Sequence, residues 1–260
     1  MNHAGQNAGH DPFSAPFLGV LGGMGPMAGA AFMARLTALT DAGSDQEHIP
    51  TILWSDPRVP DRPSGYLGTG VDPLPWMQHG VAQLERMGAR AIAIPCNTAH
   101  LWYEQLAAAT GATVLHIVRA VVKDLKRKGV QGGRIGLLGT AVTLQLELYQ
   151  RELRAQGYDY VLLDADQHLR YCAESIRLVK LNRPLDAFEP AVECIGLLTQ
   201  RGADAIVLGC TELPLALPHV ARAQFDRVIS DSIDALAADA IEWYQTQALH
   251  SARGASTTVR

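Results

Sequence analysis

Two cysteines stand in sequence contexts that suit proton transfer at a carbon atom. Cys96 follows the apolar run at residues 91–95, and Cys210 follows the apolar run at residues 205–209. Such runs are typical of buried parallel strands, and a small polar residue follows each thiol where a turn or helix can begin. A single cysteine at a strand end is usually a small buried hydrophobe. Two in matching positions suggest thiols that face each other across a cleft.

The residues after each thiol are polar. Asn97 and Thr98 follow the first cysteine, and Thr211 and Glu212 follow the second. Asn and Thr often cap helices, which would be a purely structural role. Hydroxyl, amide and helix-terminal N–H groups also bind carboxylates, so their pairing beside two thiols favours a subsite for the α-carboxylate of a small acid.

Two cations are candidates for a second carboxylate. Arg62 lies in a charged loop, residues 55–64, that three prolines stiffen, and its planar fork suits bidentate binding of a carboxylate. Lys180 is one of four lysines and the only one outside the basic cluster at residues 123–128. It follows Arg62 at nearly the spacing that separates the two cysteines, although a surface position is the usual role of a lysine.

The glycine-rich turn at residues 22–28 has the pattern G-x-G-x-x-A between a strand and a helix, as dinucleotide-binding turns do. The acidic residue that such a site needs, Asp56, comes too late in the chain, and the corresponding turn at residues 139–143 lacks the glycines. The turn therefore favours a small anion held by backbone N–H groups.

No cofactor and no metal are expected. Cys96, His100 and Cys210 form an incomplete ligand set for zinc. Lys180 is the only lysine placed to form a Schiff base, and no phosphate cup surrounds it. His116, Cys172 and Cys194 are interpreted as structural residues.

The composition is that of an ordinary soluble globular protein of 260 residues, with 48% hydrophobic and 18% charged residues. A net charge of -4 gives no attraction for nucleic acid, and no apolar run reaches the roughly 18 residues of a membrane span. Four scattered cysteines favour a reducing cytoplasm over a disulfide scaffold. Residues 1–16 and 250–260 are predicted to be a disordered leader and tail.

Apolar strand-like runs alternate with helical segments, which predicts an α/β fold with mainly parallel sheets. Strands are expected at residues 17–22, 51–54, 91–95, 114–117, 135–138, 160–163, 205–208 and 228–230, with helices from Pro26 to about Thr40 and from about Asp231 to Ala248. Similar segments recur about 115 residues apart, which indicates an internal duplication. We expect one domain from residues 17–116 plus 231–249, a second from residues 117–230, and a cleft between them where the strand ends meet.

Four motifs, at residues 22–26, 59–62, 95–100 and 209–212, carry a resemblance that covers residues 17–249. In this order they resemble the aspartate racemase branch of the cofactor-independent aspartate/glutamate racemase family. The resemblance implies an isomerase with two pseudo-symmetric α/β domains, an active site between them, an amino-acid substrate, no cofactor and a homodimer.

The resemblance also implies roles for ten residues. Cys96 and Cys210 would be the catalytic acid/base pair. The substrate-binding residues would be Met24, Arg62, Asn97, Thr98, Thr140, Lys180, Thr211 and Glu212. The chain departs from the family pattern at Pro63, where threonine is usual, and at Arg58, where glutamine is common.

The predicted reaction is the interconversion of L- and D-aspartate by two cysteines that exchange protonation states. Alternatives within the superfamily are a glutamate or broad-specificity amino-acid racemase, a hydantoin racemase, a maleate isomerase or an arylmalonate decarboxylase-like enzyme. A dinucleotide oxidoreductase and a non-catalytic amino-acid-binding protein are the alternatives from other classes.

Overall fold

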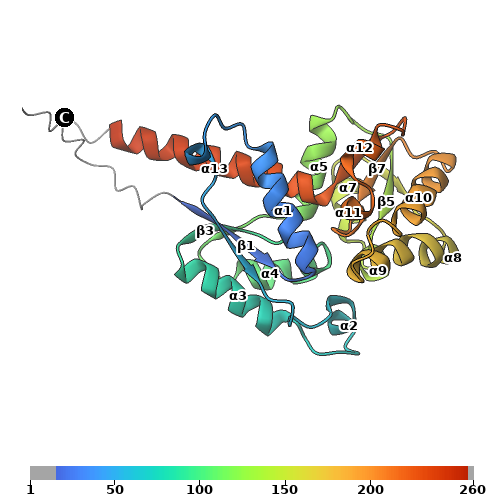
Figure 1. Cartoon of the computed structure of the whole chain (residues 1–260), viewed down its shortest axis with the longest axis horizontal. Coiled ribbons are helices and arrows are strands. Elements are labelled where there is room, and N and C mark those ends of the chain that lie inside the picture. The colour runs from blue at the N-terminus through green and yellow to red at the C-terminus, as the bar shows by residue number, and fades with distance from the viewer. Residues whose placement is uncertain (1–15, 257–260) are drawn as a thin grey trace, which may run out of the picture.

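The chain folds around two four-stranded parallel sheets, as a computed structural model of residues 16–256 shows (Figure 1). The first sheet has the strand order β2-β1-β3-β4, and the second has the matching order β6-β5-β7-β8. The strands are β1 (Phe17–Gly22), β2 (Thr51–Ser55), β3 (Ala89–Ala93), β4 (Thr113–Val114), β5 (Arg134–Leu138), β6 (Asp159–Val161), β7 (Ala205–Leu208) and β8 (Val228–Asp231). The predicted α/β class and parallel sheets are confirmed, and the equal strand orders agree with an internal duplication.

Helices connect the strands throughout. In the first half they are α1 (Pro26–Leu39), η1 (Asp45–Glu47), α2 (Arg62–Tyr66), α3 (Leu74–Arg86), η2 (Thr98–Trp102), α4 (Tyr103–Ala107) and α5 (Ile117–Arg127). In the second half they are α6 (Ala141–Gln145), α7 (Leu148–Ala155), α8 (Ala165–Gln167), the π-helical η3 (His168–Ala173), α9 (Glu174–Lys180), α10 (Phe188–Gln200), α11 (Leu213–Ala216), α12 (His219–Arg222) and α13 (Ser232–Ser256). No helix in residues 16–256 has the length and apolar composition needed to cross a bilayer.

Alternating side chains on the strands divide the interior into layers. Leu18 and Val20 of β1 and Ile135 and Leu137 of β5 belong to a single cluster, which we call the shared core. The opposite faces of the two sheets pack separately, against α3 in the first half and against η3 and α10 in the second. Successive residues of a strand point to opposite faces, so each strand is buried on both sides.

The shared core is closed by α13, which returns from the end of the second sheet to the first half. Figure 1 shows α13 running beside α1 and α5, and all three helices contribute buried side chains to the shared core. Examples are Phe32 of α1, Val121 of α5 and Leu236 of α13, which are all 0% exposed. The hydrophobic free energy of this layer therefore depends on both sheets at once.

The structure corrects several predicted boundaries. Residues 114–117 were expected to form a strand, but β4 ends at Val114 and Ile117 opens α5, because the His116 ring accepts a hydrogen bond from the Arg119 N–H at its N-terminus. The first cysteine strand begins and ends two residues earlier than expected. Asp231, where the last helix was expected to begin, is the last residue of β8, and its side chain accepts a hydrogen bond from the Asp234 N–H at 2.8 Å.

The predicted termini fall largely outside the described residues. The proposed leader, residues 1–16, lies outside them except for Pro16. Helix α13 continues to Ser256, so part of the predicted tail is helical, and residues 257–260 lie outside the described chain. The domain boundaries and the homodimer stay predictions.

Candidate active site

All ten predicted site residues line one pocket between the two halves. The pocket is narrow, and Pro63 is its eleventh lining residue. Cys96 follows β3 and Cys210 follows β7, which occupy equivalent places in the two strand orders. Because the carboxyl ends of parallel strands lie at one edge of a sheet, the duplicated order brings both thiols to the same cleft. Both cysteines are buried, at 6% and 4% exposed.

The surroundings of Cys210 keep its thiol protonated. Burial raises the pKa of Cys210 well above its ordinary value, the negative charge of Glu212 raises it further, and Lys180 opposes the shift. The thiol donates a hydrogen bond to Glu212 Oε2 at 3.0 Å. Glu212 therefore lies against a thiol as well as lining the pocket, and Cys210 is a proton donor in this arrangement.

Arg62 supplies a buried positive charge with capacity to spare. Its side chain is 8% exposed, and its hydrogen bonds within the described chain run from Nη1 to the carbonyl oxygens of Val59 and Pro60. Nε is buried and has no hydrogen-bond partner. The hydrogen bonds of this guanidinium go to neutral carbonyls, so a carboxylate ligand would add charge-assisted hydrogen bonds to it.

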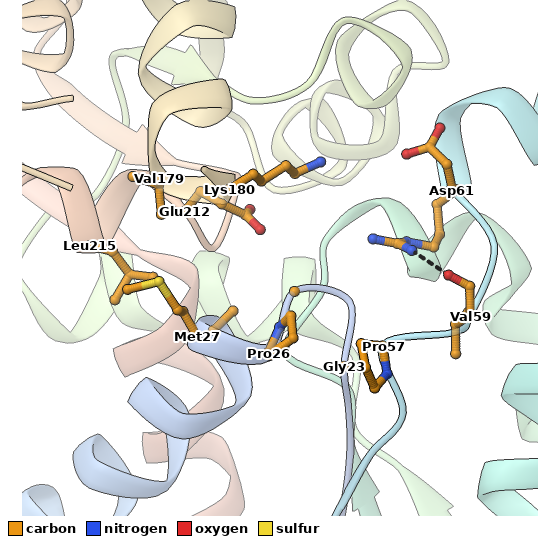
Figure 2. A pocket seen from close by; sticks show the side chains of 13 residues that line it. Gly23, Pro26, Met27, Pro57, Val59, Asp61, Val179, Lys180, Glu212 and Leu215 are labelled. Atoms are coloured by element: carbon orange, nitrogen blue, oxygen red, sulfur yellow. Dashed lines mark hydrogen bonds between the residues drawn. The ribbon is translucent and has the colours of Figure 1, made fainter. Parts of the chain in front are cut away.

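A wider pocket lies outside the first and shares Arg62, Lys180 and Glu212 with it. Figure 2 shows Lys180 and Glu212 extending from one wall toward Asp61 on the other. Burial alone would raise the pKa of Asp61, but hydrogen bonds from Ser64 and the charges of Lys180 and Arg62 lower it overall. The mouth of the cleft is therefore strongly charged on both walls.

The glycine-rich turn forms the floor of this cleft. Gly23 has a φ of 91°, and a Cβ on it would lie 2.3 Å from the Asp56 carbonyl oxygen, so only glycine fits. A Cβ on Gly25 would lie 3.5 Å from Glu212 Oε1. The turn thus passes close to the segment that follows Cys210. It also places Met24, which is 2% exposed, in the pocket wall.

Three threonine hydroxyls join the two halves beside the thiols. Thr98 Oγ1 lies 3.2 Å from Thr140 Oγ1 and 3.1 Å from Thr143 Oγ1, and the last two are 2.8 Å apart. Thr140 also caps α6 by accepting the Thr143 N–H. Thr143 was not predicted, although its place three residues after Thr140 was the signal that could have found it.

The sequence analysis also missed the partners of Asn97. Tyr149 donates its hydroxyl proton to Asn97 Oδ1 at 2.5 Å, and Asn97 Nδ2 donates to Ser232 Oγ at 2.8 Å. Ser232 begins α13 and Tyr149 lies on α7, so the signal is spread over distant parts of the chain. The Asn97 carboxamide is therefore held from inside the protein.

His100 is a structural residue of the segment that follows Cys96. Its Nε2 accepts the Ile117 N–H at 3.1 Å, so Nδ1 carries the proton and donates to the Cys96 carbonyl at 2.9 Å. Burial lowers the pKa of His100 to about 4. With both ring nitrogens engaged, His100 has no free ligand atom for a metal, and His116 is hydrogen-bonded as predicted.

Two buried thiols, a buried cation and several hydroxyl groups thus lie in one pocket at the strand ends of the duplicated parallel sheets. The class of the protein follows from comparison with known proteins. The profile of the Asp/Glu/Hydantoin racemase family matches residues 21–240, and the chain belongs to that family. The protein is therefore a racemase-type isomerase, and the predicted family is confirmed.

Individual proteins of known name or structure are similar to this chain over most of its length. An aspartate racemase of Picrophilus torridus is 31% identical, with a TM-score of 0.78 over 89% of this chain and 95% of that one. An aspartate racemase homologue of Pyrococcus horikoshii OT3 shares the fold at 20% identity and a TM-score of 0.69, over 88% and 98% of the two chains. The broad-specificity amino-acid racemase RacX of Bacillus subtilis (strain 168) is 27% identical over 87% of this chain and 97% of its own length.

Proposed function

We propose that this racemase interconverts L- and D-aspartate, with Cys96 and Cys210 acting on opposite faces of the α-carbon. The observation that carries the proposal is the buried, incompletely paired guanidinium of Arg62 in the same pocket as both thiols. The side-chain carboxylate of aspartate would pair with it, and Lys180 offers a second cation. The similarity to an aspartate racemase at 31% identity supports this choice of substrate.

The α-carboxylate lies on the other side of the pocket in this proposal. Thr98, Thr140 and Thr211 offer hydroxyl groups there, and the Met24 turn and Asn97 complete the wall. Bound at both carboxylates, the substrate presents its α-carbon between the thiols. Fixed orientation of this kind contributes a large part of the rate enhancement of enzymes.

The reaction transfers one proton in and one proton out. Cys96, as thiolate, removes the α-proton while the Cys210 thiol gives its proton to the opposite face, and the two cysteines end with their protonation states exchanged. The hydrogen bond from Cys210 to Glu212 supports Cys210 as the initial acid. The opposite enantiomer reacts with the roles reversed.

The carbanion is stabilised by the protein's own groups. The hydrogen bonds that hydroxyl and N–H groups donate to the α-carboxylate become stronger as negative charge develops on it. The narrow pocket also excludes water. No pyridoxal phosphate or metal takes part in the proposed steps. Activity is accordingly expected to survive dialysis against a chelator without added pyridoxal phosphate. A requirement for a metal or for pyridoxal phosphate would contradict the scheme.

A broader substrate range is the second candidate. The outer pocket adjoins the thiol pocket and carries apolar side chains on its walls, among them Met27, Val179 and Leu215 (Figure 2). Longer or uncharged side chains would extend into this space. The similarity to a broad-specificity racemase over 97% of its length is consistent with this alternative.

Proton NMR in deuterated water distinguishes these candidates from each other and from a binding protein. With L- and D-aspartate, the α-proton signal should disappear as solvent deuterium enters, and glutamate and alanine should exchange much more slowly. Binding without exchange would identify a non-catalytic protein. Equal exchange with alanine would favour the broad range.

The role of Arg62 is tested with a matched arginine outside the pocket. Arg62→Gln is expected to raise the KM for aspartate about tenfold or more, because charge-assisted hydrogen bonds are lost. The KM for alanine, which has no side-chain carboxylate, is expected to stay unchanged. Arg58→Gln is the control, since Arg58 is 81% exposed and pairs with Asp56. A KM for aspartate that stays unchanged in Arg62→Gln would refute the assignment.

A further inference from the structure

Tyr149 is fully buried on α7 and contacts both segments that carry the thiols. Its hydroxyl donates to Asn97 Oδ1, and Asn97 directly follows Cys96. Its ring lies against Gly209, which directly precedes Cys210: a Cβ on Gly209 would be 2.8 Å from Tyr149 Cε2 and 3.2 Å from Cζ. One side chain therefore touches the first cysteine segment with its polar end and the second with its ring.

The contact with Asn97 is fixed from both sides. Asn97 Nδ2 donates to Ser232 Oγ at 2.8 Å, which orients the carboxamide so that its oxygen faces the tyrosine hydroxyl. Burial raises the pKa of Tyr149 well above its usual value, so the hydroxyl keeps its proton and remains a donor. All three side chains are buried, and no solvent competes for these hydrogen bonds.

The contact with Gly209 is equally restrictive. Leu138 O would also lie 2.8 Å from a Cβ at this position, so any side chain larger than hydrogen would meet backbone or ring. The absence of a side chain lets the ring approach the backbone immediately before Cys210. Rigid packing of this type transmits a displacement of one segment to the other.

We propose that Tyr149 is a positioning residue that ties the Cys96 segment to the Cys210 segment and so sets the placement of the two thiols relative to a substrate between them. It touches no reacting atom. The consequence for catalysis rests on the proposed racemase function, whereas the tie between the two segments does not. Two-base proton transfer is sensitive to such placement, because a misplacement of about 1 Å costs on the order of a hundredfold in rate.

Tyr149→Phe tests the tie, because it removes one hydroxyl and keeps the ring. The matched control is Tyr158→Phe: Tyr158 is 3% exposed and donates to the Val130 carbonyl at 2.7 Å, and neither residue lines the pocket. The first readout is amide hydrogen exchange followed by mass spectrometry. The amides of His100 and Leu213, hydrogen-bonded to the carbonyls of Asn97 and Cys210, report on the two segments.

Exchange is expected to become about fivefold faster or more in both segments of Tyr149→Phe, as loss of one buried hydrogen bond allows, and to stay unchanged in Tyr158→Phe. Faster exchange in only one segment, in neither, or equally in the control variant would overturn the inference. This readout needs no substrate.

The second readout is kinetic. With aspartate as substrate, kcat of Tyr149→Phe is expected to fall by about tenfold to a hundredfold while KM changes less than about twofold. A kcat within about twofold of the wild-type value would overturn the catalytic part of the proposal. If the wild-type protein turns over no amino acid, the proposed function fails, and the exchange comparison still decides whether Tyr149 ties the segments.

Discussion

Glu212 gives the two thiols different surroundings. Its carboxylate accepts the hydrogen bond of Cys210, and the glycine turn brings backbone close to its other oxygen. The family resemblance assigned Glu212 to substrate binding, and its position in the pocket wall is compatible with that role. Its contact with Cys210 adds an influence on the acidity of the thiol that the sequence pattern did not indicate.

Glu212→Gln should therefore make Cys210 more acidic. Burial is the largest cause of the raised pKa of Cys210, and the negative charge and hydrogen bond of Glu212 come next, so their removal lowers the pKa toward its ordinary range. The measurement is the rate of Cys210 alkylation by iodoacetamide against pH, quantified by mass spectrometry. The profile should shift to lower pH. Glu174→Gln, at a surface ion pair with Arg177, is the control, and a shift of equal size there would contradict the account.

At the scale of elements, the cysteine segments are short turns supported by buried polar side chains. The helix after Cys96, η2, and the helix after Cys210, α11, span five and four residues. Such short helices have small dipoles, so they contribute little to thiolate formation. Hydrogen bonds from neighbouring elements hold these segments instead.

His100 makes this support dependent on pH. Burial lowers the pKa of His100 to about 4 and that of His116 to about 3, against 6.5 for a free histidine. The unfolded chain therefore binds more protons than the folded one between these values. Stability should be complete above about pH 6.5 and should fall as the pH drops toward 4, by on the order of 3 kcal/mol for His100.

The measurement is the free energy of unfolding in urea at pH 7 and at pH 5, for the wild type and for His100→Gln. The variant is expected to be less stable at pH 7 because it loses two hydrogen bonds, and to lose less stability on acidification. His79→Gln, at an exposed position, is the control and should keep the wild-type slope. An unchanged slope in His100→Gln would show that its ring is not the titrating group.

Much of this element-level picture follows from the sequence. Continuous apolar runs located all eight strands, because buried parallel strands have few polar residues, and the carboxyl ends of those strands carried the predicted site residues. The sequence did not indicate which side chains hold the site residues in place. Asn97 and Ser232 are 135 residues apart, and Tyr149 reads as an ordinary apolar residue of its helix, so no local pattern connects them.

At the scale of the whole molecule, the two sheets share one core. Strands β1 and β5 both pack into it, and α1, α5, α7 and α13 fill the space between. A ligand site between two separately stable lobes would permit large relative movement. Here the shared core ties the two halves together behind the cleft, and the charged residues lie at its mouth.

This core predicts a single unfolding transition. All four tryptophans lie in the first half or in α13, so their fluorescence reports on that part, whereas far-ultraviolet circular dichroism reports on both sheets. The two probes are expected to give the same urea midpoint. Leu236→Ala in the shared core should lower that midpoint in both probes, at a cost of about 2–5 kcal/mol, and Val220→Ala, at an 89% exposed position, should leave it nearly unchanged. Two separate midpoints in the wild type would contradict the shared core.

The central claim is that two thiols from the two halves act on one carbon atom, and separate replacement of each tests it most directly. The measurement is the formation of D-aspartate from L-aspartate, and of L- from D-, by chiral chromatography with Cys96→Ala and Cys210→Ala. Cys194→Ala, a buried thiol outside the pocket, is the control for folding. We predict that each pocket variant loses racemisation in both directions by at least about a thousandfold, in the range that loss of a group central to catalysis costs. Wild-type turnover in either variant would contradict the two-thiol account.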